Sequence, residues 1–169
     1  TDAEWIDFDN DGDNDLAVAG EWIKVHIFRN DNGHFADITT AAGLDETSGW
    51  WNCLQVADVD NDGDPDLIGG NLGLNSILKA TVKEPVEMYL NDFDNNGSPD
   101  QVICAYQDGV SYPVASLDDL KGQISGLDIK YPAYSDFGGK TVLDIFGKNI
   151  LDRSSVKKSV LFESCQFIN

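Results

Sequence analysis

The chain has 169 residues, of which 30 are acidic and 11 basic, and its formal net charge is −19. The first hundred residues hold 22 of the acidic side chains and only four of the basic ones. A field of this sign argues against nucleic acid or an anionic membrane surface as a partner, because both are bound through basic patches. Hydrophobic residues make up 41% of the chain, enough for a packed core, and no apolar run is long enough to span a bilayer.

The first predicted elements form a small antiparallel meander around an acidic loop. Short apolar or alternating runs predict strands at residues 4–6, 16–19, 25–29 and 34–38, with a turn at residues 30–33. Loop 1 (residues 7–15) joins the first two strands. Its odd positions are all aspartate, and they are Asp7, Asp9, Asp11, Asp13 and Asp15.

The register of loop 1 recurs twice. Loop 2 (residues 58–66) has aspartate at the same five positions, which are Asp58, Asp60, Asp62, Asp64 and Asp66. Loop 3 (residues 92–100) departs from the pattern at two positions and carries Asp92, Asp94, Asn96, Ser98 and Asp100. Strand-like runs flank both loops, so each is expected to join two antiparallel strands.

This pattern predicts calcium binding. Oxygens at loop positions 1, 3, 5 and 9, a glycine at position 6 and a backbone carbonyl at position 7 supply about six hard ligands. An EF-hand would need glutamate at position 12, where this chain has Val18, Gly69 and Ile103. The alternative is that such Asp/Asn/Gly-rich loops are simply good hairpin turns. Three copies in one register favour metal, and we expect two or three Ca²⁺ ions, with loop 3 the weakest site.

Calcium and cysteine usage bear on location. Millimolar calcium is an extracellular or periplasmic condition, so we expect the protein outside the cytoplasm or on the outer cell surface. The chain has three cysteines, Cys53, Cys104 and Cys165, in strand-like contexts with no zinc-ligand spacing. At least one buried free thiol is therefore expected.

The pattern changes after residue 115. Ser116 and Thr141 each stand three residues before an aspartate and an apolar stripe follows, which predicts two short capped helices. We expect a helical insertion at residues 116–147 between the third and fourth strands of one sheet, with residues 160–168 as the returning strand. The fold class is thus mainly β, a partial β-propeller of four-stranded blades. The predicted blades are residues 1–49, 50–85 and 86–169.

The calcium loops resemble the FG-GAP/VCBS repeats of integrin-α-like propellers. Further sequence segments resemble those of the bacterial VCBS-repeat proteins that are associated with an ASPIC/UnbV region. These segments are residues 49–52, 70–75, 84–85, 111–113 and 134–137 with 141–146. The resemblance implies a secreted or lipid-anchored surface propeller of about seven blades. This chain would hold three of them, with the remaining blades of a longer protein as its partners.

The function beyond calcium stays open between two classes. One is a surface module for protein or glycan binding and adhesion, and the other is part of a calcium-dependent polysaccharide lyase or hydrolase. An enzyme needs a base, yet the only histidines, His26 and His34, lie in a predicted strand and turn with no neighbouring motif. Trp50 and Trp51 must point to opposite faces of a strand, so one is free to stack on a sugar or to pack elsewhere. The sequence favours the binding module.

Overall fold

The computed structural model describes residues 1–169 as two compact units. The first comprises residues 1–83 and 159–169, and the second comprises residues 84–158. Strands dominate, and every strand pair whose register is defined is antiparallel. The prediction of a mainly β fold is therefore confirmed.

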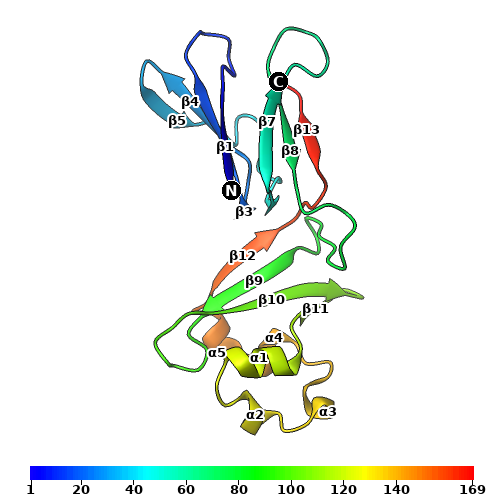
Figure 1. The fold of residues 1–169 in the computed structure, drawn as a ribbon. Coiled ribbons are helices and arrows are strands. Elements are labelled where there is room, and N and C mark those ends of the chain that lie inside the picture. The colour runs from blue at the N-terminus through cyan, green and yellow to red at the C-terminus, as the bar shows by residue number, and fades with distance from the viewer. The chain divides into compact units, whose positions relative to one another are not determined.

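The first unit begins with the loop-1 sheet, which is the predicted meander. Its strands follow the order β1-β2-β4-β5. They are β1 (Asp2–Ile6), β2 (Asp15–Ala19), β4 (His26–Asp31) and β5 (His34–Asp37). Loop 1 links β1 to β2 at one end of the sheet (Figure 1).

Two further sheets complete the first unit. The loop-2 sheet has the order β13-β8-β7, formed by β7 (Cys53–Ala57), β8 (Asp66–Gly70) and β13 (Cys165–Phe167). A two-stranded sheet pairs β3 (Glu21–Ile23), which was not predicted, with β6 (Gly49–Trp50), which holds a tryptophan that was expected on a strand. The amide of Leu54 donates to the Asp2 carboxylate at 2.9 Å, which ties β7 to β1.

The core of this unit lies between the loop-1 and loop-2 sheets. Apolar side chains of both sheets enclose Trp51, which is fully buried. Its ring covers Gly69, where an added Cβ would come within 2.7 Å of the indole. Trp50 points the other way, as predicted, and packs on Trp22 and Phe162 with ring centroids 5.0 and 5.2 Å away.

The second unit combines one sheet with five helices. The loop-3 sheet has the order β11-β10-β9-β12, with β9 (Val86–Asn91), β10 (Asp100–Gln107), β11 (Val110–Pro113) and β12 (Ser155–Ser159). Between β11 and β12 lie α1 (Leu117–Gln123), α2 (Leu127–Lys130), α3 (Tyr134–Phe137), α4 (Val142–Phe146) and α5 (Lys148–Leu151). The helices gather on one side of the sheet (Figure 1), where they bury Val102 and Cys104.

The two predicted helix starts are confirmed, and three more helices were missed. Ser116 and Thr141 both form complete capping boxes with the aspartate three residues on. The helices that were missed follow Gly126, Ala133 and Gly147, and none of these residues makes a side-chain cap. They are four residues long, too short to show an apolar period.

The predicted returning strand differs from the observed one. The loop-3 sheet is closed by β12, an exposed segment with two adjacent lysines, instead of by residues 160–168. Part of that stretch forms β13 and pairs with β8, where Phe167 packs against Trp51 with ring centroids 5.7 Å apart. No helix is long and apolar enough to cross a bilayer.

Candidate metal centres

The three acidic loops share one backbone conformation. The asparagine at position 4 is left-handed in each, with φ of 57° at Asn10, 63° at Asn61 and 59° at Asn95. The glycine at position 6 also has positive φ, between 90° and 99°. Asparagine and glycine are the residues that adopt this region most readily. The chain can therefore turn twice within nine residues.

Backbone amides orient the carboxylates of these turns. The position-1 aspartate accepts from the glycine amide at 3.2 Å in loops 1 and 2 and at 2.8 Å in loop 3. The position-5 side chain accepts from the position-7 amide at 2.8, 3.0 and 2.7 Å. Asn96 makes the last of these bonds, so its side-chain oxygen takes the place that Asp11 and Asp62 occupy in the other loops.

The position-9 aspartate links the end of each loop to its beginning. Asp15, Asp66 and Asp100 are buried, at 0%, 1% and 4% exposure. Each accepts from the position-2 amide of its own loop at 2.8 to 2.9 Å. A buried carboxylate needs such partners because burial without them is costly.

Three carboxylates converge in every loop. In each group one oxygen of every carboxylate lies within 4.8 Å of those of the other two, and the groups are Asp7, Asp9 and Asp15, then Asp58, Asp60 and Asp62, then Asp92, Asp94 and Asp100. Oxygens bound to one Ca²⁺ at about 2.3–2.6 Å can be at most about 5 Å apart. The three groups therefore fit a hard divalent cation of this size.

Other predicted ligands form hydrogen bonds with neighbouring residues. At position 7, Asp13 accepts from the Asn32 amide and Asp64 from the Asn10 side chain, each at 2.8 Å. These carboxylates lie outside the converging groups, and the backbone carbonyl of position 7 stays the predicted ligand there. Of the remaining positions, Asp11 and Asp66 also fall outside the groups.

Crowding shifts the ionisation of the central carboxylates. Partial desolvation and the nearby charges of Asp11 and Asp15 raise the pKa of Asp9 above its usual value. Desolvation and the charges of Asp62 and Asp66 raise the pKa of Asp60. In loop 3 the Ser125 amide, at 2.9 Å, lowers the pKa of Asp94. A bound dication would relieve the repulsion in loops 1 and 2.

Several contacts of these loops were not predicted. Arg29 reaches loop 1, with its Nε 3.9 Å from Asp9 and its Nη2 2.9 Å from Asp31. Asn169 touches both loop 1 and loop 2. The alternation of β4 placed Arg29 on a strand near loop 1, which is the only sequence signal for these contacts.

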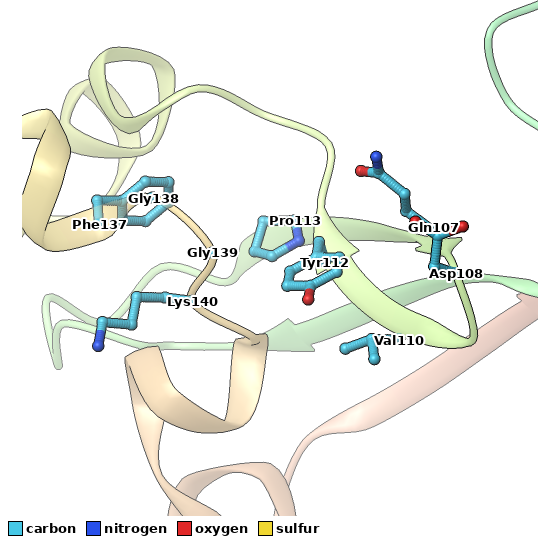
Figure 2. A pocket seen from close by; sticks show the side chains of 9 residues that line it. All are labelled: Gln107, Asp108, Val110, Tyr112, Pro113, Phe137, Gly138, Gly139 and Lys140. Carbon is cyan, nitrogen blue, oxygen red and sulfur yellow. The ribbon is translucent and has the colours of Figure 1, made fainter.

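A separate cavity of about 440 Å³ lies in the second unit, between the β10–β11 hairpin and residues 137–140. Figure 2 shows Lys140 and Asp108 on opposite sides of it, with their charged ends directed away from each other. These two charged groups therefore do not converge on the cavity. In the first unit, His26 is within 3.2 Å of the Thr39 hydroxyl and 3.6 Å of Asp37. The acidic loops are accordingly the candidate site.

Comparison with known proteins gives one match. Residues 7–69, which contain loops 1 and 2, match the family model of the FG-GAP-like repeat. No curated protein and no solved structure shows significant similarity to the chain.

Proposed function

We propose that the chain is a calcium-stabilised binding module in which all three acidic loops hold Ca²⁺. The observation that carries this proposal is the repeated convergence of three carboxylates within 4.8 Å. When bound, the ion supplies positive charge that offsets the repulsion among these side chains. The chain's own contribution is to hold the oxygens in place through the backbone amides of each turn.

We further propose that the sheets are blades of a propeller. The inner face of the loop-1 sheet is already covered by the loop-2 sheet. On its outer face Trp5 and Phe35 are 59% and 50% exposed, with ring centroids 6.3 Å apart. A further blade packed there would bury this pair as the inner face is buried. The matched repeat and the sequence strings support a ring of the FG-GAP/VCBS kind, in its ASPIC/UnbV-associated subgroup.

The proposed module acts outside the cytoplasm, in the extracellular space, in the periplasm or on the outer cell surface, where calcium is millimolar. Its ligand is a protein or a glycan, because a propeller is a scaffold whose loops carry recognition. Arrays of glycans and proteins, probed with the full-length protein with and without calcium, test this step. Binding that needs calcium supports it, and turnover of a polysaccharide would replace it with an enzymatic role.

Thermal unfolding tests the calcium proposal itself. Saturating calcium at about 100 times Kd should stabilise each occupied site by about 2.7 kcal/mol. Asp58→Ala or Asp62→Ala should remove most of the gain that comes from loop 2. Asp64→Ala should remove much less of the gain, because this side chain bonds to Asn10 and lies outside the converging group. An equal midpoint with calcium and with chelator at low ionic strength would contradict the proposal.

A further inference from the structure

Loops 1 and 2 are joined by hydrogen bonds that neither loop needs for its own turn. The Asn10 side-chain amide, at position 4 of loop 1, donates to the Asp64 carboxylate at 2.8 Å. Asp64 stands at position 7 of loop 2, beside the backbone carbonyl that this position offers to a cation. Ordering loop 1 therefore restrains Asp64 in loop 2, and ordering loop 2 restrains Asn10 in loop 1.

A second link passes through Asn169. Its side-chain amide donates to the Phe8 carbonyl at 2.7 Å, and its backbone amide donates to Asp66 at 2.9 Å. The Phe8 amide in turn donates to Asp15 at 2.8 Å. These hydrogen bonds, joined through the covalent bonds of Asn169 and Phe8, thus connect the buried position-9 carboxylates of the two loops.

Loop 3 has no share in this path. Its Asp94 accepts from Ser125 in the second unit, so its outside contact is with the helical segment. Loops 1 and 2 are thus hydrogen-bonded to each other, whereas loop 3 is hydrogen-bonded to the helical segment. Loop 3 can therefore serve as an internal control for coupling between the other two loops.

We propose that Asn10 and Asn169 are positioning residues that make loops 1 and 2 one cooperative calcium-binding pair, with loop 3 binding independently. The inference rests on the proposed calcium function. A first ion that fixes loop 1 holds Asn10 and the Phe8 carbonyl in place. Loop 2 then loses less conformational freedom when it binds the second ion, and the coupling is positive.

The experiment is a calcium titration followed by NMR. The amides of Gly12, Gly63 and Gly97 each donate to the position-1 carboxylate of their own loop, so each reports one site. Asp60→Ala, which disables loop 2 but keeps Asp64 and Asp66, should weaken the binding reported by Gly12 at least about fivefold. Gly97 should not respond.

Removing the links should remove this dependence. In Asn10→Gly combined with Asn169→Ala, the affinity reported by Gly12 should be the same with and without Asp60→Ala. Glycine is used because φ at Asn10 is 57°. Asn61→Gly is the matched control, since it makes the same change at position 4 of loop 2, where the side chain makes no link to loop 1, and it should keep the coupling.

The outcomes separate the two proposals. Signals that do not move with calcium in any loop would overturn the calcium function and the coupling together. Binding at Gly12 that ignores Asp60→Ala, or that tightens with it, would overturn the coupling alone. If Asp60→Ala does not fold, Asp62→Asn weakens loop 2 more gently and the same comparison applies.

Discussion

Single side chains set the expected differences among the three loops. Asn96 makes the same hydrogen bond as Asp11 and Asp62 but carries no charge. Loop 3 therefore matches the others in backbone conformation and in this hydrogen bond but lacks one negative charge, and calcium affinity follows the number of charged ligands. We therefore expect loop 3 to be the weakest of the three proposed calcium sites.

We predict that Asn96→Asp strengthens calcium binding at loop 3 by about tenfold, equal to about 1.4 kcal/mol. The substitution keeps the acceptor oxygen that bonds to the Ser98 amide at 2.7 Å. Asn95→Asp is the control, because it adds the same charge one residue earlier in the loop, outside the ligand positions. Calorimetric titration measures calcium binding by both variants. If Asn96→Asp leaves the affinity of the weakly bound calcium ions unchanged, the missing charge at position 5 does not limit binding at loop 3.

Elements were predictable where their signals are local. The acidic loops, the four strands of the loop-1 sheet and the two capping boxes all depend on residues close together in sequence, and the structure places them as predicted. The pairing of β13 with β8 depends on contacts between distant segments, such as Phe167 against Trp51. The exposed lysines of β12 gave no apolar alternation to reveal it as a strand.

The packing of β8 gives a test at this scale. At Gly69 an added Cβ would lie 2.7 Å from one Trp51 ring atom and 3.3 Å from Phe167. Because Trp51 is fully buried, the ring has little room to move. We predict that Gly69→Ala lowers the free energy of unfolding by about 1–3 kcal/mol.

Gly122 in α1 is the contrasting position, since a Cβ there meets nothing within 4 Å. Gly122→Ala should raise stability by up to about 1 kcal/mol, because alanine favours the helix and restricts the unfolded chain. Denaturant unfolding followed by circular dichroism at saturating calcium compares the two. Equal changes in stability for the two variants would show that the close contact with Trp51 does not determine the effect of Gly69→Ala.

At the scale of the whole molecule, the net charge is linked to the proposed calcium binding. The chain carries a net charge of −19, and its acidic residues concentrate in the loops. Two effects of acid then oppose each other. Protons compete with calcium for the ligand carboxylates, whereas in the metal-free protein protonation relieves their repulsion.

The directions of the pKa shifts fix the signs. Asp9 and Asp60 have raised pKa values in the folded state, so without calcium the folded protein takes up protons before the unfolded chain does, and acidification stabilises it. Asp66 and Asp94 have lowered pKa values, since both accept hydrogen bonds from backbone amides. Their stabilisation is present above the ordinary aspartate pKa of 3.8 and is lost only as the pH falls through their lower folded-state values.

We therefore predict that the calcium-dependent rise in Tm shrinks as the pH falls from about 7.5 to about 4.5, and that it does so above the ordinary pKa of aspartate. Over the same range the Tm of the metal-free protein should hold or rise. Tryptophan fluorescence is the suitable readout, because all four tryptophans lie in the first unit with loops 1 and 2. Asp60→Asn should reduce the pH dependence contributed by loop 2, and a calcium increment that is constant over this range would mean that the crowded carboxylates are not the ligands.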